Sequence, residues 1–205
     1  MADIKYISDF LNDPNVEGKR RVVGYVPCQP RNFTGAAGQN PDDYAVIGVS
    51  GVTIATGVDL GQTDAATLED FGVAKQTIAL FGQYFGLKSS RALTRLAEAP
   101  LSITTGAAEQ LDNTMHLGYL NRYVRPNYER FAGVSFDSLP KQAQAVIFSV
   151  CYQKGCSGVR KDWPKLWGRL IAQDWEGAAK ELKYGFTKYV NRRRREGTLL
   201  SEIVC

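Results

Sequence analysis

A Glu-Gly pair, Glu17 and Gly18, closes the first helical pattern of the chain, just before a strand-rich segment. A carboxylic acid half buried between apolar walls keeps its proton more readily than one in water, because its ionised form is disfavoured. Such an acid is able to donate a proton at neutral pH. Glu17 is therefore a candidate general acid, although the spacing also allows a surface ion pair with Lys19 or Arg20.

A hydroxyl and a carboxylate follow in residues 51–62 (GVTIATGVDLGQ), where Thr53 and Asp59 occupy positions of the same parity. Six extended residues span about 20 Å, too far for these two side chains to hold one water molecule. Gly57 is able to bend the chain by adopting a positive φ. Without further knowledge the simpler interpretation is favoured, in which Asp59 caps the following helix or forms a turn beside Gly61.

The elements that must position these groups are short. Residues 3–12 have helical spacing that Pro14 ends, residues 21–26 predict a strand, and residues 44–58 predict a glycine-broken hairpin or meander. Residues 28–43, rich in Pro, Gly, Asn and Gln, predict an exposed loop. A loop this long is typical of a cleft wall or a functional insertion.

After residue 62 the pattern becomes helical. The expected helices cover 63–71, 74–85, 88–97, 105–131, 140–152, 162–173 and 175–184. Residues 143–152 are apolar nearly all round, as in a helix enclosed by others. We therefore expect one α+β domain over residues 1–205, with a small N-terminal antiparallel β lobe (1–62), a larger C-terminal helical lobe (63–205) and a cleft between them.

The formal net charge of +4 is unevenly placed, because residues 141–205 hold 13 basic and 6 acidic side chains. A basic C-terminal third suggests an anionic partner. The run from Arg192 to Arg195 invites a nucleic-acid interpretation, but no aromatic residues are interleaved with it and no nucleic-acid motif accompanies it. We expect no nucleic-acid partner, and a solvated basic face attracted to an anionic cell wall.

Metal, cofactor and membrane functions find no support in the sequence. The four cysteines, Cys28, Cys151, Cys156 and Cys205, lack zinc or disulfide-scaffold spacing, so reduced thiols are expected. His116 stands apart from other ligand types and is expected at a surface or interface. No cofactor, no metal and no membrane insertion are predicted, and the first residues lack a secretory pattern.

Several ordered motifs together resemble the phage-lysozyme family, in its pesticin-like muramidase branch. They are Glu17-Gly18, residues 51–62 with an Asp six positions after the Thr, residues 143–155 (AQAVIFSVCYQKG) ending in Gln-x-Gly, residues 174–182 (DWEGAAKEL) and residues 191–199 (NRRRREGTL). The motifs span nearly the whole chain in the family's order, which makes the resemblance more specific than any one of them.

The resemblance implies hydrolysis of the β-1,4 bond between N-acetylmuramic acid and N-acetylglucosamine in peptidoglycan. Glu17 would protonate the leaving oxygen, and Thr53 would bind the attacking water. Asp59 would act as the base of that water or stabilise the positive charge that develops on the sugar ring. Arg192 falls where the family has an arginine that pairs with the catalytic Glu, with Arg193 as the alternative.

Further expectations follow from the same resemblance. Gln153 would bind or orient substrate. Inverting hydrolysis needs carboxylates about 6.5 to 9.5 Å apart, and this is the predicted route. The commoner phage branch carries its second carboxylate before the Thr, where this chain has Ile47, so Asp59 is preferred and Asp42 and Asp43 are held in reserve.

The biological role expected is that of a monomeric phage endolysin. It would be made in the host cytoplasm without a signal peptide and would act on the cell wall after release by a holin. A toxin or effector domain with the same chemistry, delivered to the periplasm, is one alternative. The other is a non-catalytic wall-binding homologue, which would have no need of Glu17, Thr53 and Asp59 together.

Overall fold

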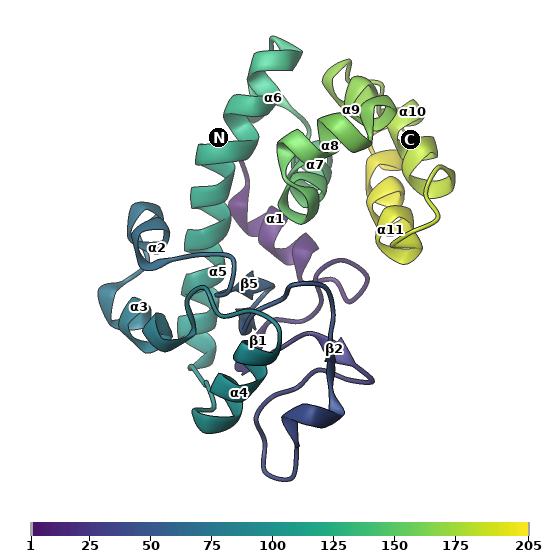
Figure 1. Ribbon diagram of the computed structural model, residues 1–205. Coiled ribbons are helices and arrows are strands. Elements are labelled where there is room, and N and C mark those ends of the chain that lie inside the picture. The colour runs from purple at the N-terminus through teal and green to yellow at the C-terminus, as the bar shows by residue number, and fades with distance from the viewer. Residues whose placement is uncertain (1, 205) are drawn as a thin grey trace. The chain divides into compact units, whose positions relative to one another are not determined.

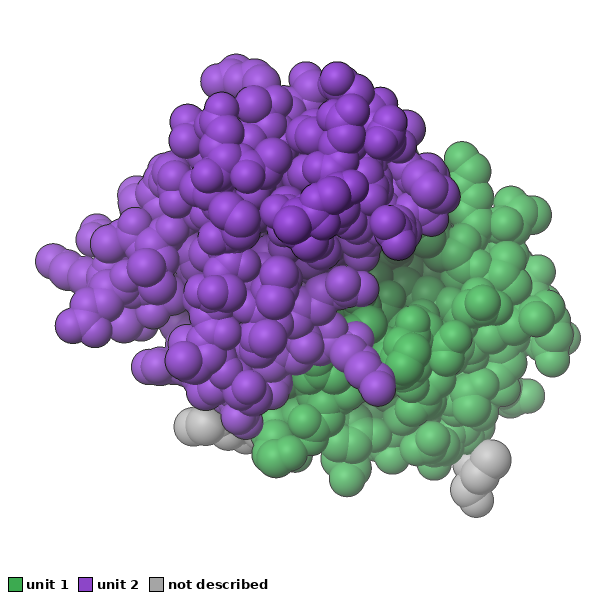
Figure 2. Space-filling model, turned by 90° about the horizontal axis from the view of Figure 1, so that it is seen from below, with its two compact units in different colours: residues 1–18, 116–205 green, residues 19–115 purple. Residues whose placement is uncertain are grey.

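The computed structural model describes residues 2–204, which fall into two compact units. Unit 1 comprises residues 1–18 and 116–205, and unit 2 comprises residues 19–115 (Figure 2). Each unit has its own hydrophobic core. The expected α+β class is confirmed, because most of the described elements are helices and the few strands are short and antiparallel.

The units differ from the expected lobes in where the chain divides. The first helix packs with the C-terminal helices in unit 1, not with the strands, because Ile7, Phe10 and Leu11 are buried in the unit 1 core. Unit 2 keeps the strands together with the helices that follow them up to Met115. The sequence pattern changes from strand-like to helical after residue 62, whereas the packing of the chain divides it after residues 18 and 115.

Unit 1 is helical. Its elements are α1 (Ile4–Leu11), the π-helical segment η3 (Leu120–Val124), α6 (Arg125–Ala132), the 3₁₀ turn η4 (Phe136–Ser138), α7 (Lys141–Lys154), α8 (Cys156–Asp162), α9 (Pro164–Ile171), α10 (Trp175–Tyr184) and α11 (Val190–Ser201) (Figure 1). Residues 143–151 of α7 are all buried, which confirms that this segment is the enclosed central helix. The helices α8 and α11 were not predicted, since Gly155 and the arginine run interrupt the apolar periodicity on which the prediction relied.

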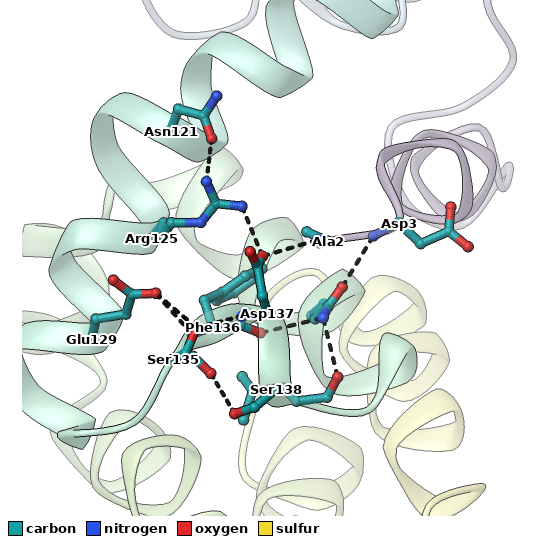
Figure 3. Close-up of polar contacts among 11 residues, drawn as sticks. Ala2, Asp3, Asn121, Arg125, Glu129, Ser135, Phe136, Asp137 and Ser138 are labelled. Atoms are coloured by element: carbon teal, nitrogen blue, oxygen red, sulfur yellow. Dashed lines mark hydrogen bonds and ion pairs between the residues drawn. The ribbon is translucent and has the colours of Figure 1, made fainter.

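Hydrogen bonds within unit 1 hold the residues just before α1 in place (Figure 3). The backbone N–H of Ala2 donates to Asp137 Oδ1 over 2.9 Å, and that of Asp3 donates to Gln144 Oε1 over 3.3 Å. Arg125 holds Asp137 in turn, through a 2.8 Å contact to the same Oδ1. Ala2 and Asp3 lie just before the helix, so these bonds fix the position at which the helix that leads to Glu17 begins.

His116 is fully buried in unit 1, so its expected surface position is wrong. Its Nδ1 lies 2.8 Å from Ser8 Oγ, and its ring meets Phe148 and Tyr152 edge-on. Histidine carries one apolar body and two polar atoms, and here the helix α1 supplies a polar partner inside an aromatic cluster. One residue in isolation gave no indication of that partner.

Unit 2 combines short strands with helices. Its elements are β1 (Arg21–Tyr25), β2 (Cys28–Gln29), the 3₁₀ turn η1 (Pro41–Asp43), β3 (Ala45–Val46), β4 (Thr53–Ala55), β5 (Val58–Asp59), α2 (Ala65–Phe71), α3 (Lys75–Phe81), the 3₁₀ turn η2 (Gly82–Tyr84), α4 (Ser90–Glu98) and the start of α5 (Thr105–Tyr119). One antiparallel sheet has the order β1-β4-β5, and β2 pairs with β3 separately. The loop expected at 28–43 is wrong at its first residues, because Cys28 is buried and pairs with Val46.

The β4–β5 hairpin brings two predicted site residues to the same rung of the sheet. Thr53 is the direct cross-strand partner of Asp59. Gly57 turns the chain with φ 79°, which confirms the expected bend. Ala55, two residues earlier, also has a positive φ, 52°, a conformation that favours glycine.

Two further properties of the described residues bear on the earlier expectations. Cys28, Cys151 and Cys156 are free and buried, while Cys205 lies outside the described residues. Within residues 2–204 no helix has the length and apolar character that crossing a bilayer requires.

Candidate active site

Glu17 lies on a tight turn after α1, not at the end of the helix itself. The helix ends at Leu11, and the Glu17 N–H donates back to the Leu11 carbonyl over 3.1 Å. Gly18 then leaves with φ 93°, a conformation that glycine adopts without strain. The Glu17 side chain is 20% exposed.

The ion-pair partner of Glu17 is Arg192 on α11. Arg192 Nη1 lies 2.5 Å from Glu17 Oε1, so Arg192 and not Arg193 makes this contact. One helical turn further on, Arg195 Nε pairs with Asp13 at 2.6 Å. Two ion pairs therefore hold the turn between Asp13 and Glu17 against α11, and the carboxyl of Glu17 has a defined orientation.

Arg192 is itself held by two residues that the sequence analysis did not single out. Its Nε donates to Glu196 Oε1 over 3.1 Å, and its Nη2 donates to both the carbonyl and the Oγ of Ser149 at 2.9 Å. Ser149 Oγ also donates to Glu196 Oε1 over 2.6 Å. Burial alone would lower the pKa of Arg192, but the carboxylates of Glu17 and Glu196 reverse this and raise it.

Arg193 completes the charged cluster. It is fully buried, its Nη1 lies 2.6 Å from Glu196 Oε2, and its Nη2 donates to Gln153 Oε1. Its guanidinium lies over the Trp163 ring, 4.9 Å from the centroid. Burial lowers the pKa of Arg193, only partly offset by Glu196. The expected solvated basic face is wrong for these first two arginines, because α11 turns them inward onto acidic and aromatic partners.

A pocket of about 470 Å³ opens at Glu17 within unit 1. Its lining residues are Pro14, Asn15, Val16, Glu17, Gln153, Tyr189, Val190, Asn191 and Arg192. Because Gln153 Oε1 accepts from Arg193, the N–H groups of its Nε2 are the part that remains to donate to a bound molecule. The pocket thus presents an acid, an arginine, amides and an aromatic ring, the groups that recognise a polar ligand with ring faces.

The Asp59 carboxylate is tied to the hairpin backbone in unit 2. Its Oδ1 accepts from Gly61 N over 2.8 Å and from Gly51 N over 3.1 Å, while Oδ2 lies 3.2 Å from the same Gly51 N. Burial raises the pKa of Asp59, and the backbone N–H groups and the Lys88 charge offset this in part. A carboxylate with a raised pKa and one lightly engaged oxygen is able to accept a proton.

Glycine is required where this backbone closes around Asp59. A Cβ on Gly51 would lie 2.6 Å from the Cα of Gly61 and equally close to the carbonyl oxygen of Leu87. The glycines of the 51–62 motif therefore permit a close backbone approach that side chains would prevent. The hydrogen bonds of Asp59 agree with the simpler interpretation, in which it forms a turn beside Gly61.

Thr53 is buried beside Asp59 on the sheet. Its Oγ1 donates to the Gly51 carbonyl over 3.3 Å, which leaves the hydroxyl oxygen to accept from a water molecule. The turn after Thr53 is anchored by an unpredicted residue, the fully buried Asp112 on α5. Asp112 accepts from the N–H and the hydroxyl of Thr56 at 2.8 and 2.6 Å, and pairs with Arg20 at 2.6 Å.

The reserve carboxylates lie elsewhere in unit 2. Asp42 and Asp43 are exposed residues of the η1 turn, whereas Asp59 is partly buried and fixed by backbone bonds. Asp42 and Asp43 therefore lack the burial that Asp59 has. Among residues 2–204, no group of three or more His, Cys, Asp and Glu side chains lies together in a way that suits a metal ion.

Comparison with known proteins gives one informative result. The model of a family named Pesticin, described as "Bacterial toxin homologue of phage lysozyme, C-term", matches residues 7–176. The matched range includes Glu17, Thr53, Asp59 and Gln153, and ends before Arg192. No curated protein sequence matches the chain.

Proposed function

Because the chain belongs to the Pesticin family of bacterial toxin homologues of phage lysozyme, we propose that it is a muramidase. Family membership supports a lysozyme-like α+β fold and a lysozyme-type peptidoglycan hydrolase or toxin. The proposed reaction is hydrolysis of the β-1,4 bond between N-acetylmuramic acid and N-acetylglucosamine. The observation that carries the proposal is the Glu17–Arg192 pair, which places an oriented carboxyl at the wall of a pocket.

Glu17 acts in this proposal as the general acid. Arg192 binds Oε1 and fixes the plane of the carboxyl, so the proton to be donated is carried on Oε2. Transfer of that proton to the glycosidic oxygen lets the aglycone leave as an alcohol, while positive charge develops on the sugar ring. Proton transfer by a positioned acid contributes about 10²- to 10⁴-fold to the rate.

Thr53 and Asp59 prepare the water in the same proposal. The Thr53 hydroxyl accepts a hydrogen bond from the water, and Asp59 Oδ2 takes the proton that the water loses as it attacks the anomeric carbon. Their direct pairing across β4 and β5 supports a shared water. Attack by water on the face opposite the leaving group inverts the anomeric configuration, which NMR of the first product anomer measures directly.

Digestion of purified peptidoglycan tests the proposal. The wild type and Glu17→Gln are compared by mass spectrometry of the soluble fragments, with Glu181→Gln as the matched control. Glu181 pairs with Lys165 at 2.5 Å and neither residue lines the pocket at Glu17, so this control removes one ion pair but none of the groups around Glu17. We expect reducing muramic acid ends from the wild type and the control, and none from Glu17→Gln.

Other products would replace the proposal with a different function. Anhydro-muramic ends would identify a lytic transglycosylase, and equal digestion by Glu17→Gln would remove Glu17 from the mechanism. A folded wild type that releases no fragments but sediments with peptidoglycan would identify a non-catalytic wall-binding homologue.

Two biological roles suit this chemistry. We infer a monomeric phage endolysin that is made in the host cytoplasm and reaches the wall after holin action. An antibacterial toxin or effector domain is the second candidate, and the family description favours it by naming a bacterial toxin. Lysis only when a holin is co-expressed supports the first role, whereas killing of neighbouring cells by a secreted or delivered form supports the second.

A further inference from the structure

The arginine that orients Glu17 is shared with a second carboxylate. Glu196 lies one helical turn after Arg192 on α11 and is fully buried. Its Oε1 receives Arg192 Nε and the Ser149 hydroxyl, and its Oε2 lies 2.6 Å from Arg193 Nη1. Both oxygens of Glu196 are therefore engaged by cationic or hydroxyl partners.

Burying this many charges is costly for a purely structural purpose. The desolvation penalty of a buried carboxylate is offset only when its cationic partners are well placed. Apolar side chains of similar volume at the same positions often stabilise a fold equally well. The cluster does reach the functional pocket, because Arg192 extends from Glu196 to Glu17. A chemical role for Glu196 accounts for what packing alone leaves unexplained.

The charges within the cluster indicate what that role is. Arg192 and Arg193 contribute two positive charges, and Glu196 cancels one of them. Without Glu196, Arg192 would lose the carboxylate that receives its Nε and would lie beside the like charge of Arg193. No other described residue of α11 would then hold Arg192 Nη1 toward Glu17 Oε1, and a general acid must be oriented toward the leaving oxygen that takes its proton.

We propose that Glu196 is a positioning residue for the reaction, which holds the Arg192 guanidinium in place so that Arg192 orients the carboxyl of Glu17. This inference rests on the proposed role of Glu17 as the acid. Ser149 assists by bonding both Glu196 and the Arg192 guanidinium from α7.

Other groups near Glu17 do not take over this task. The segment before it carries Asp13, whose charge is paired with Arg195. The helix α7 presents uncharged Ser149 and Gln153 to the cluster, and Tyr189 lines the pocket ahead of α11. Among the described groups in direct contact with Arg192, Glu196 is the carboxylate besides Glu17 itself.

Steady-state kinetics of Glu196→Gln test the inference, with soluble uncrosslinked glycan strands as substrate. The amide keeps the volume of Glu196 and removes its charge. We expect kcat to fall by about 10- to 100-fold, as for a misplaced catalytic group, with KM changed by less than about twofold. Glu181→Gln is the control and should change neither.

Several outcomes would overturn the inference. Wild-type kcat in Glu196→Gln would make Glu196 structural only, and so would a loss of activity that follows the folded fraction measured by circular dichroism. If Glu196→Gln does not fold, Ser149→Ala decides: a lowered kcat at unchanged KM supports positioning, and unchanged kcat refutes it. An inactive wild type, by contrast, would refute the proposed function itself.

Discussion

Substitution of Asp59 separates its role in the turn from its role in the chemistry. Asp59→Asn retains an Oδ1 that is able to accept from both Gly51 and Gly61, and removes only the charge and the second oxygen. Asp59→Ala removes the acceptors altogether and leaves two backbone N–H groups without them. The two variants therefore alter the turn to different extents while both abolish a carboxylate base.

The structure sets the expected stability changes. A hydrogen bond to a charged group contributes about 1.5 to 3 kcal/mol, so Asp59→Ala should lower the free energy of unfolding by about 3 kcal/mol or more. Asp59→Asn should change it by about 1 kcal/mol or less, because the Oδ1 bonds remain and the amide has no charge to desolvate.

The pH dependence has a defined sign. Burial raises the pKa of Asp59 above its ordinary value of 3.8. A group with a raised folded-state pKa contributes stability below its unfolded-state pKa, and this is lost as the pH rises through the folded-state value. Asp59→Asn is therefore expected to gain stability relative to the wild type as the pH rises from below 3.8 to 7, as measured by urea unfolding.

Activity should respond differently. Loss of a general base lowers the rate of hydrolysis by about 10²- to 10⁴-fold. Both variants should therefore release few reducing ends from peptidoglycan. Asp64→Asn is the matched control, because Asp64 caps α2 in the same unit through the N–H of Thr67. Full activity in Asp59→Asn, with losses in Asp59→Ala that match unfolding, would refute the reasoning and leave Asp59 as a turn residue.

Two further predictions concern the frame of the site. Gly57→Ala should lower the free energy of unfolding by about 1 to 2 kcal/mol, because alanine disfavours the φ of 79°. Thermal unfolding measures this, and the control Gly106→Ala, within a helix, is expected to be neutral or stabilising. Phe148→Ala should lower the free energy of unfolding by about 3 to 5 kcal/mol, because it leaves a cavity in the core around α7. Phe131→Ala should lower it much less, because Phe131 is 39% exposed, and urea unfolding measures both. Equal losses for Phe148 and Phe131 would contradict the assigned core.

Local rules were enough to predict much of the frame. Helical periodicity located α1 and the enclosed α7, and the glycine at position 57 indicated the turn that pairs Thr53 with Asp59. These features depend on residues close together in the chain, so their spacing and backbone freedom can be recognised in the sequence without knowledge of tertiary contacts. The family resemblance, confirmed by the match over residues 7–176, supplied the chemical roles that spacing alone did not.

Tertiary packing decided what surrounds the predicted acid. The run from Arg192 to Arg195 looks solvated in sequence, yet Arg192 reaches Glu17 across 175 positions, and Arg193 is buried against Glu196. Only the packing of α11 on α7 reveals which charges are desolvated. Asp112 illustrates the same limit in unit 2, because an acid within a helix becomes an anchor only when Thr56 is brought to it.

The sequence by itself determined the helices with a clear apolar periodicity, such as α1 and α7, together with the hairpin and the candidate carboxylates, since these follow from periodicity, glycine positions and ordered motifs. Only the tertiary structure decided that Arg192 is the partner of Glu17, that Glu196 and Ser149 hold that arginine, and that Asp59 carries backbone bonds as well as a raised pKa. The physical reason is that burial and Coulombic pairing depend on distance in space, which the order of residues along the chain does not specify.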